Sequence, residues 1–390
     1  MYDLIILGTG TMGSSVCYHA AKAGLNVLGL DQFKPPHKNG SHSGGTRIIR
    51  QAYFEHPNYV PLLHSAYEGW NSWENEAGKT LFHKCGLAYG GEPESELISG
   101  VLRSVNDHQL NIEPSLGADK EAGFDVPGSF KMLFEKNAGF AIADESIETV
   151  LELARKQGCD FQFDDRVVGW ELRNGHVEVY TKKEVYKSRK IVITSGAYSG
   201  PLIPKLRRKV EVTRQKLFWF EIDNSESFQE GKFPCWCFQD PDYPGLFYGF
   251  PYFQTGTSHH PRGLKIAYHY PGEIMSENFI GADHVETPYG EELVHIEKFI
   301  DKYLRLENPQ LVDRATCFYS NSPDKDFIID FLPGTDQKVV FAAGFSGHGF
   351  KFAPVIGKIV LDLTTLGNTG HPIDFLRLGR FSKTANPKEV

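Results

Sequence analysis

The chain begins with a short apolar run that leads directly into a glycine-rich turn. Residues 2–7 have the length and composition of a buried strand, and residues 8–13 read Gly-Thr-Gly-Thr-Met-Gly. A helix-patterned stretch then ends at Gly24, and a second apolar run at 25–30 is closed by Asp31. This order of strand, turn, helix, strand and acid is typical of a dinucleotide-binding βαβ unit. A glycine-rich turn alone would be weak evidence, but with its flanking strands and its acid it predicts a bound dinucleotide.

Each residue of this signature has a separate physical role. Gly8 permits the tight turn, Gly10 lets the backbone approach a pyrophosphate, and Gly13 allows helix and strand to pack closely. The helix N-terminus offers free N–H groups and a partial positive charge to the phosphates. Asp31 can accept hydrogen bonds from ribose hydroxyls, and its charge would repel a 2′-phosphate, so NADP is disfavoured.

Length and composition narrow the class of protein further. A chain of 390 residues is too long for one simple core, and we expect two domains. The hydrophobic content of 41% is ordinary for a globular enzyme, and the net charge of −8 argues against nucleic acid or an anionic membrane as the main partner. No apolar run is long enough for a transmembrane helix. The six cysteines lack paired CxxC spacing, so we expect no metal site and a cytoplasmic location.

The order of the predicted strands indicates a discontinuous nucleotide domain. Apolar strands at 191–193 and 339–343 return to the first sheet, whereas residues 210–270 carry the aromatic-rich pattern of a separate antiparallel sheet. We therefore predict an α/β (α+β, two-domain) fold, with a Rossmann-like nucleotide domain and a second antiparallel-sheet domain. The nucleotide domain takes residues 1–80, 140–208 and 315–390, and the substrate domain takes residues 81–139 and 209–314. Helical spacing is predicted at 60–77, 145–158, 291–303 and 353–366.

Two arginines follow a glycine-rich loop after the first βαβ unit. If Thr46 caps a helix, Arg47 and Arg50 are three residues apart and their guanidinium groups lie on one face near the dinucleotide. The alternative is a pair of solvated arginines. Because the dinucleotide-binding turn is close, we favour contact of at least one with the cofactor or with an anionic substrate.

A second glycine-rich loop lies near the C-terminus, at residues 344–351. It contains Gly344, Gly347 and Gly349 and precedes a helix, so backbone N–H groups can again face an electron-rich group. Such a loop suits a flavin, whose reduced ring carries negative charge, whereas a nicotinamide would not need it. The alternative is a flexible loop without a ligand.

Polar residues also occur within the predicted second sheet. Lys265 and His269 share one face of a strand, about 13 Å apart. Burial of a lysine costs free energy, so we favour a strand face on which Lys265 and His269 line a cavity. The alternative is that this face is exposed to solvent. Cys317, judged by its spacing alone, is a small core residue.

Together these residues match a known family. Almost the whole chain resembles the monomeric sarcosine oxidase and N-methyltryptophan oxidase family of flavoprotein amine oxidases, which is related to pipecolate oxidase. The matching segments are Pro35-Pro36-His37, Gly40-Ser41-His42, Thr46-Arg47-Ile48-Ile49-Arg50, Tyr248-Gly249-Phe250-Pro251, Leu264-Lys265, Tyr268-His269, Cys317, Tyr319, Phe327-Ile328-Ile329-Asp330 and residues 344–352.

The resemblance implies a set of cofactor contacts. It implies FAD bound covalently through its 8α-methyl group to Cys317, in place of a simple core role, with Arg47 stacked near the flavin ring. Val167 lies in a predicted strand region at residues 160–170, where the chain pattern alone places it beside the adenine end of the cofactor. The cofactor-binding residues predicted in this way are Gly8, Gly10, Gly13, Asp31, His42, Ser43, Arg47, Val167, Cys317, Gly344, Gly347, His348, Gly349 and Lys351.

The resemblance also implies the catalytic residues and the reaction. Arg50 and Lys351 would hold a substrate carboxylate, since two buried cations without a partner would be unfavourable. Lys265 would activate O₂, and His269 and Tyr319 would line the substrate pocket. The implied enzyme is a monomer, and its implied substrate is a secondary amine that carries a carboxylate. Hydride transfer from this amine to FAD yields an imine, which hydrolyses to a primary amine and formaldehyde. O₂ then reoxidises the flavin and becomes H₂O₂.

Two departures from the family pattern affect the substrate more than the reaction. Ser43 stands where the family commonly has a second histidine, and residues 254–262 are longer than expected. An oxidase of pipecolate, proline or a glycated amino acid therefore remains the main alternative. A nicotinamide-dependent dehydrogenase and a flavin-binding protein without turnover are the others.

Overall fold

The predicted βαβ unit forms the centre of the first sheet. The computed structural model describes residues 1–115, 117, 123–206, 209–254, 256, 260–270, 272–275 and 290–383. Strand β1 (Tyr2–Leu7), helix α1 (Thr11–Lys22) and strand β2 (Val27–Leu30) occur in the expected order, and β1 pairs in parallel with β2. The last four residues of β1, Leu4 to Leu7, are all apolar because their side chains alternate between two buried faces.

Segments from distant parts of the chain complete this sheet. Strand β11 (Val185–Ile193) pairs in parallel with both β1 and β19 (Val339–Ala343), as the apolar patterns predicted. The sheet order is β18-β19-β11-β1-β2-β8, and a hairpin of β9 and β10 joins β11. The remaining bounds are β8 (Asp160–Gln162), β9 (Val167–Arg173), β10 (His176–Thr181) and β18 (Ile328–Phe331).

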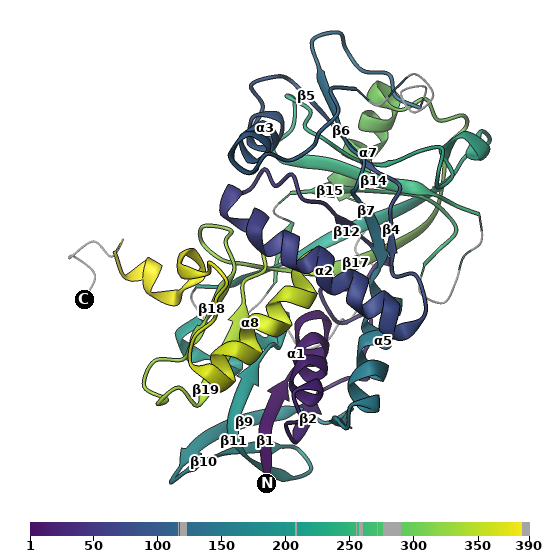
Figure 1. Cartoon of the computed structure of the whole chain (residues 1–390). Coiled ribbons are helices and arrows are strands. Elements are labelled where there is room, and N and C mark those ends of the chain that lie inside the picture. The colour runs from purple at the N-terminus through teal and green to yellow at the C-terminus, as the bar shows by residue number, and fades with distance from the viewer. Residues whose placement is uncertain are drawn as a thin grey trace.

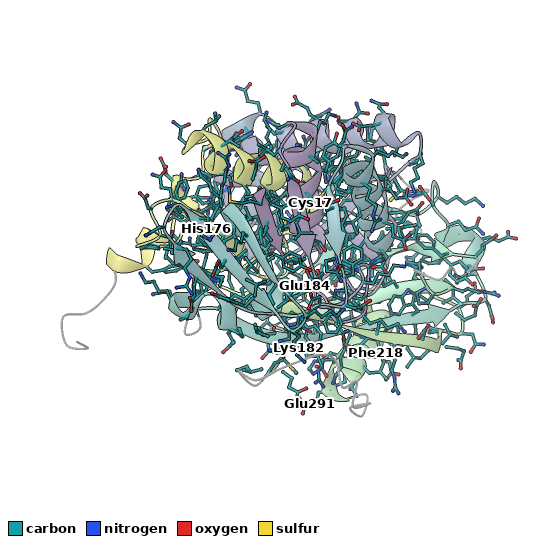
Figure 2. The ribbon with its side chains drawn as sticks, turned by 90° about the horizontal axis from the view of Figure 1, so that it is seen from below. Cys17, His176, Lys182, Glu184, Phe218 and Glu291 are labelled. Atoms are coloured by element: carbon teal, nitrogen blue, oxygen red, sulfur yellow. The ribbon has the colours of Figure 1, made fainter. Side chains whose placement is uncertain are left out.

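Helices cover one face of the first sheet. Helix α1 lies between α8 (Ala353–Leu366) and α5 (Ala143–Lys156), and α2 (Val60–Ala77) crosses them (Figure 1). Helices α2 and α8 have the predicted bounds, and α5 begins and ends two residues earlier than predicted. In the view from below, Cys17 lies in this helical layer and Phe218 lies on the second sheet (Figure 2).

The second sheet is mainly antiparallel and packs against α7 (Gly290–Tyr303). Leu264, Ile266 and Tyr268 face the aromatic core beneath α7, whereas Ala267 faces the opposite side, which confirms the predicted period of two. The sheet order is β16-β12-β15-β14-β13-β5-β6, with β17 paired to β12. The bounds are β5 (Leu87–Gly91), β6 (Lys131–Glu135), β12 (Glu211–Glu221), β13 (Cys235–Phe238), β14 (Leu246–Phe253), β15 (Gly263–His269), β16 (Glu273–Ile274) and β17 (Gln310–Asn321).

A small third sheet corrects one prediction. Thr46 does not cap a helix, because Thr46–Ile49 form strand β3, which pairs with β7 (Gly139–Ile142); β7 also pairs with β4 (Phe82–His83). Residues Thr46, Ile48 and Ile49 are β-branched and favour a strand once a partner is present. Arg47 and Arg50 therefore do not share a helical face.

The chain crosses between the two large sheets at several points. The predicted domain boundary at residues 314 and 315 falls inside strand β17, so the segment that carries Cys317 belongs to the second sheet. Shorter elements connect the rest, and the division into domains stays a prediction. These elements are α3 (Glu96–His108), α6 (Ser199–Leu202), η1 (Pro57–Tyr59), η2 (Gly196–Tyr198), η3 (Pro204–Leu206), η4 (Ser225–Phe228), η5 (Phe350–Phe352), η6 (Asp374–Leu376) and η7 (Leu378–Lys383).

Neither a membrane-spanning helix nor a metal-binding cluster occurs among the described residues. Within the described ranges, no helix is long and apolar enough to cross a membrane. The same residues contain no group of three or more His, Cys, Asp or Glu side chains that could hold a metal ion. Of the loop at 254–262, which is predicted to be longer than in the family, residues 255 and 257–259 lie outside the described residues.

Candidate active site

A cavity of about 490 Å³ opens where the two large sheets meet. One side consists of the turns that follow the carboxyl ends of β1, β2 and β11, which is where ligands bind in open α/β sheets. The other side includes residues of β17 and of the second glycine-rich loop. The predicted site residues on its wall are Gly8, Gly10, Asp31, His42, Arg47, Val167, Tyr319, Gly347 and Gly349.

The glycine turn has the geometry that its sequence predicts. Gly8 has a φ of +92°, which favours glycine, and an added Cβ on Gly13 would lie 1.8 Å from the Gly8 carbonyl oxygen. An added Cβ on Gly10 would come no closer than 3.6 Å, to His42 Nδ1. Among the described residues no side chain caps α1, so its first N–H groups are available to a pyrophosphate beside Thr11.

This geometry separates the roles of two glycines. Gly13→Ala is expected to destabilise the protein by about 3 kcal/mol or more, because its methyl group would overlap the backbone of Gly8. Gly10→Ala should leave the fold intact and lower only FAD retention, because its methyl group fits the protein and fills space for phosphate. Thermal melting and flavin content measure the two effects. Equal melting losses in both variants would contradict this assignment.

Asp31 has a second role that the sequence did not indicate. Its Oδ2 accepts a hydrogen bond from the Thr9 N–H at 2.7 Å, and its Oδ1 accepts one from the Phe33 N–H at 3.1 Å. The carboxylate therefore stabilises the glycine turn and also lines the cavity. Val167 lines the cavity as well. A ribose would share this acid with the backbone.

Two polar atoms on the wall test whether FAD fits. The Oγ of Ser320 and the Nδ1 of His37 are buried and have no hydrogen-bond partner among the described residues, and both residues line the cavity. Buried polar atoms are normally paired, so unpaired atoms on two residues that line the cavity are consistent with a polar ligand there. With the uncapped helix and the glycine turn, these residues fit a dinucleotide.

Arg47 is held by backbone carbonyls. Its guanidinium donates to the carbonyl oxygens of Thr46, Ser41 and Ser43 at 2.8, 2.7 and 2.6 Å. Ser43 therefore acts through its carbonyl and is not on the wall. Burial, with help from the charge of Arg47, lowers the pKa of His42 well below its usual value, so this wall residue is neutral.

Lys265 and Cys317 lie behind the wall. Lys265 is fully buried, and its Nζ donates to Gly44 O at 2.6 Å and to Thr46 O at 3.0 Å. Cys317 is 2% exposed and packs in the small core beside Ala267. Burial, and then the charge of Arg47, lowers the pKa of Lys265 well below its usual value, whereas burial raises the pKa of the Cys317 thiol.

The structure adds a counter-ion for Arg50. Glu55 accepts two hydrogen bonds from Arg50 Nη2, at 2.5 and 2.6 Å, and Arg50 is only 4% exposed. Burial opposes the charge of Glu55, but Arg50 first, then His348 and Lys351, lower its pKa to about 2. Two buried cations were expected to lack a partner other than the substrate. For Arg50 this expectation is wrong, because Glu55 is its partner within the protein. Nothing in the spacing of Arg50 and Glu55 signals this pair.

Lys351 lies close to the same cluster. Its Nζ donates to the carbonyl oxygen of His348 at 2.8 Å and lies 5.2 Å from the centre of the Tyr53 ring, while Arg50 Cζ lies 4.3 Å from that ring. Burial, and next the charge of Arg50, lower the pKa of Lys351 to about 7 despite Glu55. The structure thus brings the two predicted cations to one aromatic ring, although neither is on the cavity wall.

Glu135 is a further residue that sequence reasoning missed. Its carboxylate accepts hydrogen bonds from the backbone N–H groups of Gln51 and Ala52 at 2.6 and 3.2 Å, and from the Tyr89 hydroxyl at 2.6 Å. It therefore holds the segment that follows Arg50. The sequence contains no signal of this contact, because only the position of strand β6 in the folded protein brings Glu135 to this segment.

His269 and Tyr319, both predicted for the substrate pocket, contact each other, and only Tyr319 is on the cavity wall. His269 Nδ1 and the Tyr319 hydroxyl form a hydrogen bond of 2.9 Å, and Tyr319 lines the cavity. Burial lowers the pKa of His269 to about 4, so it is neutral near pH 7. Gly347 packs against the Tyr319 ring, since an added Cβ would lie 2.4 Å from it.

The second glycine-rich loop is tied down along its length. The Ser346 N–H donates to Ser320 O at 2.9 Å, and the ring of His348 is hydrogen-bonded on both sides. Gly347 and Gly349 reach the cavity. Gly344 and His348 do not line it, and their contact with the cofactor stays a prediction. Gly344 turns the chain with a φ of +66°.

Comparison with known proteins agrees with this geometry. The sequence model of the FAD dependent oxidoreductase family (DAO) matches residues 3–363. Monomeric sarcosine oxidase from Bacillus sp. (strain NS-129) is 35% identical over 385 residues, 97% of each chain. N-methyl-L-tryptophan oxidase from Yersinia pestis (strain Pestoides F) is 34% identical over 364 residues, 92% of this chain and 93% of that one.

Solved structures agree on the fold. L-proline dehydrogenase from P. horikoshii superposes with a TM-score of 0.81 over 98% of each chain, at 20% identity. The resemblance and the α/β fold predicted from sequence are thus confirmed, and FAD is the cofactor of the matching family. The chain belongs to the DAO family of FAD-dependent oxidoreductases, alongside the monomeric sarcosine oxidases and N-methyl-L-tryptophan oxidases.

Proposed function

We propose that this protein is a flavoprotein oxidase of secondary α-amino acids, such as sarcosine or another N-methyl amino acid. The observation that carries the proposal is the meeting of Arg50 and Lys351 on Tyr53. FAD, when bound, would supply the redox chemistry: the carbon beside the amine nitrogen would be the hydride donor, and O₂ would be the final acceptor, reduced to H₂O₂. The released imine hydrolyses to a primary amine and an aldehyde, which is formaldehyde for an N-methyl group.

The chain's own residues bind and orient the reactants. Arg50 and Lys351 hold the substrate carboxylate, which replaces part of the pairing that Glu55 supplies to Arg50. The neutral pair of His269 and Tyr319 offers hydrogen bonds beside the amine. Neither group carries a charge near pH 7, so this pair does not repel the amine. The amine binds as the neutral base and therefore has a free electron pair.

For the cofactor, we propose that the glycine turn and Asp31 hold the pyrophosphate and ribose, with Val167 at the adenine end. His42 and Arg47 lie toward the flavin. Lys265 is proposed as the group that favours O₂ reduction. The cytoplasm and a monomeric state are part of this proposal; the six cysteines are free thiols in the structure.

Covalent attachment through Cys317 gives a direct prediction. Wild-type protein should keep its yellow colour in the pellet after acid precipitation, and Cys317→Ser should release all of it into the supernatant. Cys237→Ser is the matched control, because Cys237 is also a buried thiol of the second sheet. Flavin absorbance in the two fractions measures the outcome. Release of flavin from wild-type protein would exclude the bond while leaving noncovalent FAD binding intact.

Lys351 gives a prediction of pH dependence. Its lowered pKa of about 7 means that the cation is present below pH 7 and lost above it. The affinity for propanoate, a carboxylate without an amine, should be constant at low pH and fall up to tenfold per pH unit well above 7. Calorimetric titration from pH 5.5 to 9.5 measures this, and Lys351→Met should abolish the dependence. An identical slope in that variant would assign the titration to another group.

The proposed function is tested by H₂O₂ release from purified protein. Sarcosine, N-methyltryptophan, pipecolate, proline and fructosyl-glycine cover the expected substrate and its alternatives, and methylated amines without a carboxylate are the negative controls. Activity on a carboxylated secondary amine is expected. Comparable activity on amines that lack a carboxylate would overturn the carboxylate site, and a colourless protein that reduces NAD would overturn the oxidase.

A further inference from the structure

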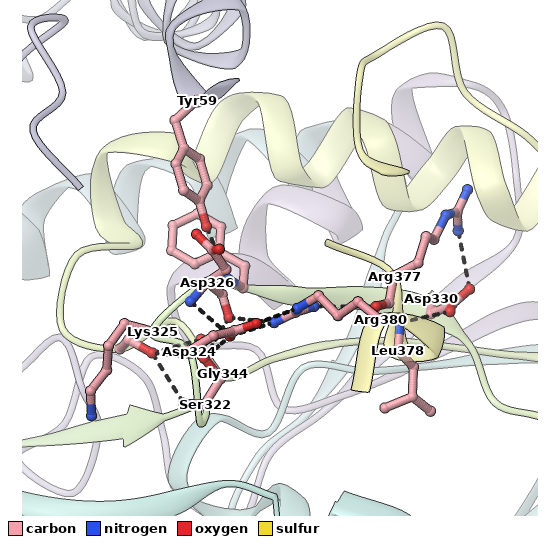
Figure 3. A network of polar contacts seen from close by, with 12 residues as sticks. Tyr59, Ser322, Asp324, Lys325, Asp326, Asp330, Gly344, Arg377, Leu378 and Arg380 are labelled. Atoms are coloured by element: carbon pink, nitrogen blue, oxygen red, sulfur yellow. Dashed lines mark hydrogen bonds and ion pairs between the residues drawn. The ribbon is translucent and has the colours of Figure 1, made fainter. Parts of the chain in front are cut away.

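The last described segment of the chain lies beyond the family match and contacts a turn near the active site. The family match ends at residue 363, whereas η7 begins at Leu378. Figure 3 shows Arg380, from this segment, beside Asp324. Arg380 donates from Nε and Nη2 to the two carboxylate oxygens of Asp324 at 2.7 and 2.9 Å, and from Nη2 to Asp326 O at 3.0 Å. The planar guanidinium group of Arg380 therefore binds both ends of the turn at 324–326.

The turn needs such support because its central residue is strained. Lys325 has a φ of +67°, a left-handed conformation that is unfavourable for a side chain with a Cβ. Inside the turn, Ser322 Oγ donates to Asp326 O at 2.6 Å and the Asp326 N–H donates to Asp324 Oδ1 at 3.2 Å. Arg380 adds the contacts from outside. Its side chain is only 16% exposed, so these hydrogen bonds are partly protected from water.

The strained residue in turn orients His348. The Lys325 carbonyl accepts a hydrogen bond from His348 Nε2 at 2.9 Å. A carbonyl oxygen can only accept, so Nε2 carries the proton and Nδ1 of the neutral ring is an acceptor. The Tyr53 hydroxyl donates to this Nδ1 at 2.5 Å. The position of the Lys325 carbonyl therefore selects the tautomer that binds Tyr53.

Both proposed carboxylate-binding cations contact Tyr53, and one of them, Lys351, also contacts His348. The Tyr53 ring lies 4.3 Å from Arg50 Cζ and 5.2 Å from Lys351 Nζ. The His348 carbonyl accepts the hydrogen bond from Lys351 Nζ at 2.8 Å. A continuous set of contacts thus runs from Arg380, through the turn and His348, to both cations.

We propose that Arg380 is a positioning residue for the carboxylate site, which rests on the proposed function of Arg50 and Lys351. It acts by holding the Lys325 carbonyl where His348 needs it. A purely structural role would be to anchor the C-terminal segment. The neighbouring Arg377 serves that role as well, since its Nη1 lies 3.2 Å from Asp330 Oδ1, but Asp330 belongs to strand β18 and not to the turn.

The test compares Arg380→Gln with Arg377→Gln in the flavin-loaded enzyme. Titration calorimetry with propanoate should show at least a fivefold weaker affinity in R380Q and less than a twofold change in R377Q. In steady-state assays KM for the carboxylated amine should rise in parallel while kcat stays within twofold. Equal changes in the two variants, or none in R380Q, would overturn the proposal. If R380Q does not fold, R380K, which keeps the charge without the planar guanidinium group, takes its place.

A rescue variant tests the route through the turn. Lys325→Gly removes the cost of the left-handed conformation, so R380Q/K325G should bind propanoate within twofold of wild-type protein. Failure of this rescue would exclude the turn as the link. If wild-type enzyme binds propanoate but oxidises no carboxylated amine, the proposed function fails while the positioning role is still measured. If wild-type enzyme does not bind propanoate, the positioning role is overturned as well.

Discussion

Lys265→Met is expected to slow reoxidation of the reduced enzyme by O₂ on the order of 100- to 1000-fold, while flavin reduction by substrate changes only a few-fold. The first step of O₂ reduction creates the negative charge of superoxide. A fixed cation close by lowers the free energy of that charge in a site without water. Methionine fills a similar volume but carries no charge.

The surroundings of Lys265 explain why its charge is available when it is needed. Burial and then Arg47 lower its pKa, so these surroundings by themselves disfavour the cation. The carbonyls of Gly44 and Thr46 accept its protons, and the negative charge of a reduced flavin would raise the pKa again. The protonated lysine is therefore favoured in the form of the enzyme that meets O₂.

Stopped-flow measurement of the two half-reactions separates this role from substrate binding. Lys351→Met is the matched control, since it also removes one buried lysine but from the carboxylate site. It should weaken substrate binding and leave reoxidation nearly unchanged. Impairment of both half-reactions to the same extent in Lys265→Met would assign this lysine to substrate binding instead.

Arg50→Ala is expected to lower kcat/KM for the carboxylated substrate about 100- to 1000-fold, because a charge-assisted and buried contact is lost. It should also destabilise the fold, because Glu55 would stay buried without its partner. Breaking a buried ion pair in this way costs about 3–5 kcal/mol. The loss of activity in this variant alone therefore mixes two effects.

The double variant Arg50→Ala/Glu55→Ala separates them. Removal of both charges should restore much of the stability, measured by urea unfolding, but none of the affinity for the carboxylate. Glu55→Ala alone should leave Arg50 more available to a substrate anion and keep the affinity. Recovery of kcat/KM in the double variant would show that Arg50 acts only through the structure.

Much of the fold could be predicted because its signals are local. The glycine turn requires glycine at Gly8 and Gly13 for reasons of backbone angle and contact distance, and both reasons hold in any chain with that motif. Helices α2 and α8 have the predicted bounds because their apolar spacing covers every turn. The face of β15 that buries Lys265 followed from the period of two.

For the site, the identity of four residues could be predicted, but their hydrogen-bond and ion-pair partners could not. Arg50, Lys351, His269 and Tyr319 were identified by family resemblance, and the structure brings them into two adjoining groups. Their pairing depends on neighbours that no local pattern names. Glu55 in particular reaches Arg50 through an irregular segment, where neither helical nor strand periodicity relates one side chain to another.

Only the tertiary structure decided the remaining features. Thr46–Ile49 are a strand because β7, far along the chain, supplies the missing hydrogen bonds, and isolated residues with that sequence could also begin a helix. Arg380 holds the turn at Lys325 because the C-terminal segment packs back onto β18. The sequence by itself determined the βαβ unit and the helix faces, since both depend on residues close together in the chain, and it determined the family, since each matching motif is a short segment. Long-range packing set the counter-ions and tautomers, because burial and hydrogen-bond geometry exist only after distant segments meet.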